Sequence, residues 1–149
     1  MEKTTINLLD EINDYSGIHS IDRDDVSALM LEFSKRITNT LKIERISAWL
    51  FNPKQNILTS IGEYDSRDAS FKYGTELLIE PHLNYFKAVK ENRIIIAQNI
   101  RKNEHTMELN EHYSIPNDII SLMDIPLRIS GELIGVLCFE KTGSEERLF

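Results

Sequence analysis

The last third of the chain contains two long, mainly apolar segments, 119–129 and 132–141, separated only by Ser130 and Gly131. A two-residue connection of this type between strand-like segments is typical of a tight antiparallel hairpin. Pro126 lies inside the first segment and has no backbone N–H, so we expect an edge position or a bulge there. This hairpin favours an antiparallel sheet as the centre of the fold.

Further strands and helices precede the hairpin. Residues 46–51 are apolar at both alternating sets of positions, which predicts a strand that is covered on both faces and lies inside the sheet. The remaining segments are a helix at 22–41, a return strand at 57–61, a polar loop at 62–70, a helix from Glu80-Pro81 to Asn92, a strand at 94–97 and a partly helical stretch at 99–117. This order predicts an α+β fold: a central antiparallel sheet of five to six strands with helices on both faces.

The chain has 149 residues, which is enough for one domain with a sizeable core. We expect an acidic lead-in helix at 1–21 and the main domain at 22–143. Residues 144–149 then read as the start of a truncated C-terminal linker or helix.

Charge and cysteine content exclude several functions. The 24 acidic side chains outnumber the 17 basic ones, giving a formal charge of -7, which argues against nucleic-acid binding and against docking on anionic membranes. Cys138 is the single cysteine, so the chain has no internal disulfide, no multi-cysteine zinc site and no two-cysteine redox cycle. No apolar run approaches the roughly 20 residues of a membrane span, and the first residues do not resemble a signal peptide. We therefore expect a cytoplasmic protein.

The helix at 22–41 carries two rows of side chains. The apolar row, which we expect to cover the sheet, contains Val26, Leu29, Met30, Phe33, Ile37 and Leu41. The second row contains Ser27, Leu31, Ser34 and Thr38 at spacings of 4, 3 and 4, which coiled-coil seams also have. This second row is either a solvated face or a dimer contact between two such helices.

The motifs of catalysis are missing from the sequence. No glycine-rich phosphate loop, no G-x-S-x-G and no H-E-x-x-H is found. His105, Glu108 and His112 share one face of a predicted helix, but seven residues separate the two histidines by roughly 10 Å, too far for one zinc ion. The sequence therefore predicts no catalytic residue, no metal site and no identified cofactor, while an unknown small molecule remains open.

One set of aromatic and polar residues forms the best binding candidate. Ser47, Trp49 and Phe51 share one face of their strand, opposite the face that the first helix is expected to cover. The residues that could close a pocket over this face are Tyr85, Phe86, Asn99, Tyr113 and Met123. Mostly apolar walls with a few polar groups suit a small molecule, although the same side chains could simply fill the core.

Asp124 interrupts an otherwise apolar strand in Leu122-Met123-Asp124-Ile125-Pro126. A carboxylate in this position is either solvent-facing or structurally salt-bridged, or it is buried and contacts a ligand. We keep it among the candidate ligand-binding residues. Cys138, flanked by Leu137 and Phe139, is interpreted as a structural thiol.

Three segments together resemble a GAF domain, the small-molecule sensory module of many bacterial signalling proteins. They are Leu41 to Phe51 after the first helix, Ile119 to Pro126, and Gly131 to Glu140, and the resemblance covers roughly residues 22–143. It implies a central antiparallel sheet with helices from the two ends of the domain on one face and a ligand pocket on the other. A PAS domain is the rival fold, but the long leading helix and the closing hairpin favour GAF.

The sequence departs from the best-known ligand-binding members of that family. Asn99 and Lys102 could begin the set that binds cyclic nucleotides, but no suitable Phe and Asp-Glu pair follows. Bilin-binding members attach their chromophore through a cysteine, and Cys138 is expected inside a core strand. Members that reduce free methionine sulfoxide use several cysteines, and here there is one.

The resulting expectation is a non-catalytic, small-molecule-sensing regulatory domain. Such a domain would pass its ligand state through a helical homodimer contact to an output signalling domain, in the same chain or in a separate one. A histidine kinase or a diguanylate cyclase are outputs that the resemblance suggests. The alternative is a ligand-free dimerisation or protein-docking module with a filled core.

Overall fold

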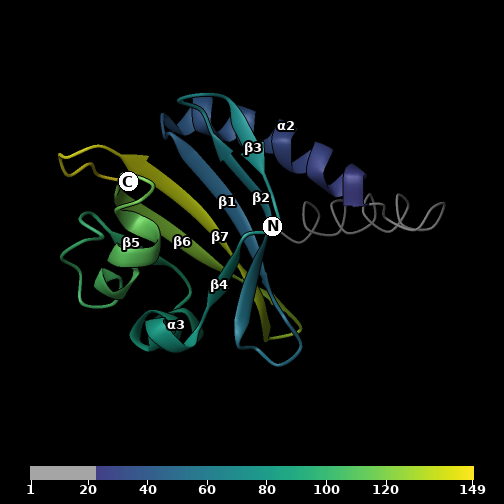
Figure 1. Cartoon of the computed structure of the whole chain (residues 1–149), viewed down its shortest axis with the longest axis vertical. Coiled ribbons are helices and arrows are strands. Elements are labelled where there is room, and N and C mark those ends of the chain that lie inside the picture. The colour runs from purple at the N-terminus through teal and green to yellow at the C-terminus, as the bar shows by residue number, and fades with distance from the viewer. Residues whose placement is uncertain (1–22) are drawn as a thin grey trace.

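The structure is a computed structural model that describes residues 23–149 (Figure 1). Its helices and helical turns are α2 (Arg23–Leu41), η1 (Glu80–His82), α3 (Leu83–Glu91), η2 (Met107–Leu109) and η3 (Asn110–Ser114). Its strands are β1 (Arg45–Phe51), β2 (Ile57–Asp65), β3 (Ser70–Lys72), β4 (Glu76–Leu78), β5 (Ile95–Ala97), β6 (Ile119–Ile129) and β7 (Glu132–Thr142). The lead-in helix expected at 1–21 lies outside the described residues.

The strands form one sheet in the order β3-β2-β1-β7-β6-β5, with β4 paired to β2, and all pairings are antiparallel. Figure 1 shows α2 on one side of this sheet, and α3 with the segment before β6 on the other. The predicted α+β class with helices on both faces is confirmed. The described sheet has seven strands rather than five to six because the short strands β3 and β4 add to β2.

The prediction of a polar loop at 62–70 was wrong for residues 62–65, because β2 continues to Asp65, whereas residues 66–69 form a turn. Its polar side chains are satisfied by tertiary partners that local sequence cannot reveal. The Glu63 carboxylate accepts hydrogen bonds from the hydroxyls of Ser60 at 3.0 Å and Thr75 at 2.5 Å. Asp65 is ion-paired with Arg45 at 3.1 Å. Buried polar groups with such partners are tolerated in a strand.

The closing hairpin is confirmed. Ser130 and Gly131 have φ angles of 51° and 85°, and positive φ at both central residues is the mark of the type I′ turn that suits the twist of antiparallel strands. Pro126 is also explained, since β5 pairs with β6 only at residues 122–124 and leaves that side of β6 unpaired further along. The register shifts just after Leu127. Pro126 predicted either an edge position or a bulge, and the structure has both in this part of β6.

The orientation predicted for the first helix was right for only half of the apolar row, of which Val26, Met30 and Ile37 are half-buried. Leu29, Phe33 and Leu41, assigned to the sheet-covering row, are 61%, 40% and 43% exposed. Ser34 and Thr38, assigned to a solvated face or dimer contact, are 0% and 4% exposed. The helix therefore turns its small residues toward the sheet and part of its large apolar residues away from it.

The reason for this orientation is that the large apolar side chains between α2 and the sheet come mainly from the sheet. The α2-facing core contains Ile43, Ile46, Tyr64 and Phe139. Leu31 packs against this cluster, and Met30 lies so close to Gly62 of β2 that a Cβ there would be 3.2 Å from the Met30 Cβ. Close approach of helix and strand favours small residues between them. The dimer contact predicted for Ser27, Leu31, Ser34 and Thr38 is therefore withdrawn, since Leu31, Ser34 and Thr38 pack within their own chain and Ser27 is half-buried.

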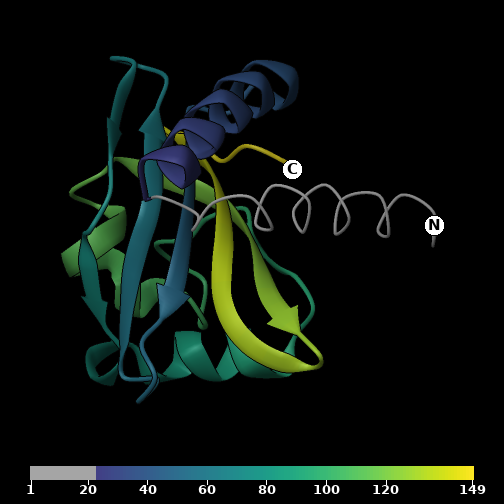
Figure 2. The ribbon, with the colours of Figure 1, turned by 90° about the vertical axis from the view of Figure 1, so that its right-hand side faces the viewer.

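The larger core lies on the opposite face, between the sheet and α3 with η2 and η3. Figure 2 shows this second layer behind the strands, with α2 crossing in front of the sheet. Within residues 23–149, no helix combines the length and the apolar content that crossing a bilayer would require.

Candidate ligand site

The site is built on a row of side chains that crosses the three central strands. In the sheet register, Ser47 of β1 lies opposite Cys138 of β7, and Cys138 lies opposite Asp124 of β6. Directly opposed residues point to the same face, so all three face the layer that contains α3. Trp49 and Val136 form the next pair along on the same face. The predicted orientation of Ser47 and Trp49, away from the first helix, is confirmed.

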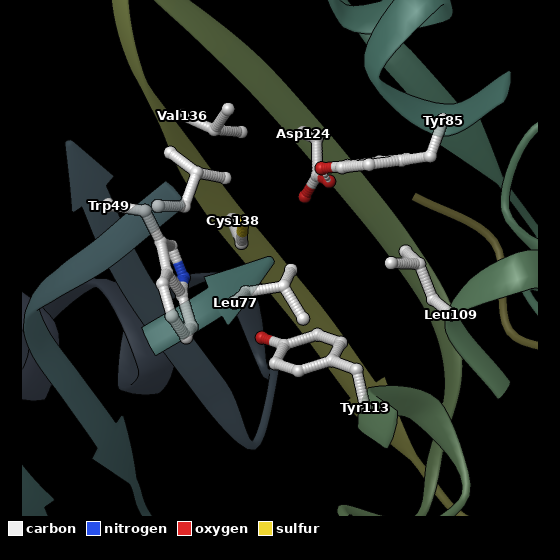
Figure 3. A pocket seen from close by; sticks show the side chains of 9 residues that line it. Trp49, Leu77, Tyr85, Leu109, Tyr113, Asp124, Val136 and Cys138 are labelled. Carbon is white, nitrogen blue, oxygen red and sulfur yellow. Dashed lines mark hydrogen bonds between the residues drawn. The ribbon is translucent and has the colours of Figure 1, made fainter. Parts of the chain in front are cut away.

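A small cavity lies above this row. Its walls are Trp49, Leu58, Leu77, Tyr85, Leu109, Tyr113, Asp124, Val136 and Cys138 (Figure 3). Trp49 and Tyr113 meet edge to face with ring centroids 5.9 Å apart. The cavity volume is about 10 Å³, which is roughly the space for a single water molecule. The pocket expected from the sequence is therefore present as a place in the fold but is nearly filled by its own lining.

Asp124 is the polar group at this cavity. The residue is 2% exposed, and its Oδ2 accepts a hydrogen bond from the hydroxyl of Tyr85. Its Oδ1 has no hydrogen-bond partner. The thiol of Cys138, directly opposite on β7, is only a weak donor, and its interaction with the Asp124 carboxyl lowers the carboxyl pKa less than burial raises it. Figure 3 shows the carboxyl pointing from β6 into the space between Tyr85, Trp49 and Tyr113.

Burial raises the pKa of the Asp124 carboxyl to about 7. The hydrogen bond from Tyr85 opposes this rise by stabilising the charged form, and the negative charge of Glu140 adds to it. Burial likewise raises the pKa of the Cys138 thiol, with Asp124 as the next cause, so the thiol stays protonated. The interpretation of Asp124 as solvent-facing or salt-bridged was wrong: it is buried, and none of the ion pairs among the described residues includes it.

A buried ionic network borders the cavity on the side of Tyr113. The Tyr113 hydroxyl donates to Glu140, and Glu140 accepts from the Nε of Arg45 at 3.0 Å. Arg45 also donates to Asp65 at 3.1 Å. Burial acts to lower the pKa of Arg45, but Glu140 and the other partners raise it above its ordinary value, so the guanidinium is charged. The positive charge of Arg45 is therefore paired with the carboxylates of Glu140 and Asp65, and it does not neutralise a negative charge on Asp124.

A second chain of hydrogen bonds orients the Trp49 ring. Its Nε1 donates to the Ser47 hydroxyl at 2.9 Å, and that hydroxyl lies 3.4 Å from the hydroxyl of Tyr113. Ser47 therefore acts on the cavity through the two aromatic rings and is not one of its walls.

The structure brings together five of the predicted site residues, namely Ser47, Trp49, Tyr85, Tyr113 and Asp124. Phe51 and Phe86 lie in the same core layer with ring centroids 5.8 Å apart, but they do not line the cavity.

Two predicted site residues lie elsewhere. The Asn99 side chain donates to Glu146 at 2.9 Å, near the C-terminal end of the chain. Met123 packs against the core on the α2 side, because neighbouring residues of a strand point to opposite faces and Asp124 already faces the cavity. The assignments of Asn99 and Met123 to this pocket were therefore wrong.

Sequence reasoning missed the apolar half of the lining and the ionic network. Leu58, Leu77, Leu109 and Val136 carry no sequence signal beyond being apolar. Arg45 and Glu140 did carry a signal, since each stands at an inward-facing position of a strand beside apolar residues. For metals, no three His, Cys, Asp or Glu side chains in the described part of the chain are grouped as an ion would require.

The comparisons with known proteins identify the family. The model of the GAF domain matches residues 25–148, so the chain belongs to the GAF domain family. This membership confirms the resemblance seen in the sequence and places the chain among the sensory domains of signalling proteins. None of the curated protein sequences compared with the chain matches it significantly.

Solved structures share the fold, and two of the three described here are of GAF domains. The blue-light absorbing form of the PixJ GAF domain from Thermosynechococcus elongatus is 19% identical with a TM-score of 0.63, and the match covers 89% of this chain and 77% of that one. A methyl-accepting chemotaxis protein fragment is 16% identical with a TM-score of 0.65, covering 84% and 77%. The GAF domain of a two-component sensor histidine kinase from Bacillus halodurans is 19% identical with a TM-score of 0.56, covering 87% and 82%.

Proposed function

We propose that the chain is a non-catalytic, ligand-sensing input domain that acts in the cytoplasm and controls an output signalling domain in its own or a separate chain. The observation that carries this proposal is the cavity on the α3 side, where aromatic walls surround a buried carboxyl with one unsatisfied oxygen. Apolar walls with a few placed polar groups are what small-molecule sites offer.

Binding requires the lining to move, because the cavity is about 10 Å³. The movable parts are β4, which pairs only with β2, and the segment of short helical turns before β6. A ligand would favour the arrangement in which these parts stand away from the sheet. It would shift the domain only by the difference between its affinities for the two arrangements.

The test is a titration with a broad metabolite panel, followed by Trp49 fluorescence and by melting temperature. Trp49 is the single tryptophan and lines the cavity. A ligand at one hundred times its Kd adds about 2.7 kcal/mol to the free energy of unfolding, which raises the melting temperature of a chain of this size by roughly 8 °C. If no metabolite changes either signal, the sensing proposal fails.

Homodimer formation is part of the proposal, with a contact that differs from the sequence prediction. Leu29 and Phe33 of α2 are large, apolar and exposed, and they lie one helical turn apart on the side of the helix that faces away from the sheet. A second copy of the chain could bury this pair against its own.

Two variants of α2 separate the dimer contact from the core contact. Leu29→Glu should dissociate the dimer in sedimentation without lowering the melting temperature of the monomer. Leu31→Glu, on the packed side, should destabilise the domain itself. A wild-type chain that sediments as a monomer at all concentrations would contradict the dimer.

A ligand-free docking or dimerisation module is the second candidate. The nearly filled cavity favours it, since a packed interior needs no ligand. The metabolite titration distinguishes the two functions, because the docking module predicts a dimer and no stabilising small molecule.

A further inference from the structure

We propose that the ligand of this cavity is a small organic cation, a branched alkylammonium, whose N–H groups donate to Oδ1 of Asp124 while its apolar body takes the place of the Leu77 side chain. This inference rests on the proposed sensory function and names the class of ligand for the same site. Four features of the described residues support it: an unused acceptor, an uncompensated negative charge, aromatic walls and one wall residue that can be displaced.

The unused acceptor is Oδ1 of Asp124. The residue is 2% exposed and its other oxygen is already occupied by the Tyr85 hydroxyl. A buried acceptor without a partner costs the folded state free energy that a bound donor restores. The other polar atoms around the cavity have partners: Trp49 Nε1 donates to Ser47, and the Tyr113 hydroxyl donates to Glu140. A ligand that enters here therefore meets one free oxygen acceptor, beside the weakly polar thiol of Cys138.

The charge around this acceptor favours a cation over a neutral donor. The titratable groups that act on Asp124 or on its direct neighbours are Tyr85 on α3, Tyr113 on η3, Arg45 on β1, and Cys138 and Glu140 on β7. Arg45 is the only cation among them, and it is paired with Glu140 and Asp65. An ionised Asp124 thus faces a neighbourhood with no free positive charge, and a bound ammonium would supply it.

The aromatic walls also suit a cation. Trp49 and Tyr113 line the same cavity as Asp124. The faces of aromatic rings attract ammonium groups, with Trp the strongest of them. An anionic ligand would instead be repelled by the ionised carboxyl of Asp124.

The removable wall is Leu77 at the centre of β4. The strand is three residues long and is held by β2 alone, and the Leu77 side chain is only half-buried. Displacing it disturbs fewer contacts than displacing Val136 or Leu109, which are fully enclosed. The branched body of the ligand would then fill the volume that the isobutyl group of Leu77 vacates.

The test uses isobutylammonium as the probe and isobutanol as its neutral counterpart of the same shape. Both are titrated into Leu77→Ala protein, in which truncation opens the volume of an isopropyl group next to Asp124, and binding is followed by Trp49 fluorescence. Leu77→Val provides a smaller opening if the alanine variant does not fold cooperatively. The matched control is the double variant Leu77→Ala with Asp124→Asn, which keeps the shape of the side chain and removes its charge.

We expect isobutylammonium to bind at pH 8 at least about tenfold more tightly than isobutanol, and this preference to fall below about threefold in the Asp124→Asn control. From pH 6 to pH 8 the affinity for isobutylammonium should rise by about tenfold as Asp124 ionises, since an alkylammonium, like the Lys side chain, remains charged over this range.

Two results would overturn the inference. Equal or tighter binding of isobutanol would show that the cavity accepts apolar ligands without regard to charge. Absence of binding by both probes in the opened cavity would show that Asp124 does not recruit a cation. Neither result removes the sensory proposal, which fails only if the metabolite panel on wild-type protein also yields no ligand.

Discussion

The carboxyl of Asp124 makes the stability of the domain depend on pH in a way that a conservative variant can isolate. Its pKa is about 7 in the folded chain and has a reference value of 3.8 without the fold. Between these two pKa values the folded state holds a proton that the unfolded state releases. The contribution of this carboxyl to the free energy of unfolding is therefore fully present below the pKa of the unfolded chain, and it is lost as the pH rises to the pKa of the folded chain. The difference of about 3 units corresponds to about 4 kcal/mol in total, because each unit is worth about 1.4 kcal/mol.

Asp124→Asn removes this dependence while preserving the shape of the side chain and its ability to accept the Tyr85 hydroxyl. The protonated carboxyl and the amide have similar polarity, so wild type and variant should differ least in acid. The free energy of unfolding of the variant, measured relative to wild type, should rise by about 3 kcal/mol between pH 5 and pH 8, with nearly all of the rise below pH 7.

The assay is urea denaturation of both proteins at pH 5, 6, 7 and 8, followed by Trp49 fluorescence. Taking the difference between the two proteins cancels the other titrating groups, such as Asp65, that both chains share. A difference that stays constant to within about 0.5 kcal/mol over this range would refute the reasoning, because it would mean that Asp124 ionises in the fold as it does in water.

The ionic network and the central strands yield further predictions. Glu140→Gln should lower the free energy of unfolding by about 3 kcal/mol, because it leaves the buried charge of Arg45 only partly compensated, and urea denaturation measures the loss. Gly135→Ala should cost about 4 kcal/mol or more in the same assay, because the new Cβ would lie 2.1 Å from the backbone oxygen of Trp49. Gly74→Ala is its control and should cost only about 1 kcal/mol, since it has a φ of +83° but open space around it.

Periodicity in the sequence was sufficient for the central strands but not for the first helix. The hairpin of β6 and β7 could be predicted because its turn residues adopt positive φ and its strands are long and apolar. Half of the helix row was misassigned because hydrophobicity alone selected Leu29 and Phe33 for the core. The sheet beneath α2 already supplies large side chains, so its contact requires small ones such as Ser34, and this depends on the partner surface.

For the candidate site, the sequence could predict only which face of the sheet each strand residue points to, because side chains alternate between the two faces along a strand. Ser47 and Trp49 were placed on the correct face by alternation within one strand. The same rule, applied to β6, would have separated Met123 from Asp124, which point to opposite faces. The near absence of space in the cavity could not be predicted, because it depends on how Leu77, Leu109 and Tyr113 pack together across segments distant in the chain.

The central claim is that ligands enter on the α3 side of the sheet and not on the side covered by α2. The most direct measurement is a two-dimensional NMR titration of ¹⁵N-labelled protein with any metabolite that raises the melting temperature. The account predicts that the indole N–H resonance of Trp49, which is bonded to Ser47, shifts with the ligand concentration, and that it shifts further than the backbone resonance of Ser34 on the packed side of α2. A stabilising ligand that shifts the resonances of α2 and leaves the Trp49 indole unchanged would contradict it.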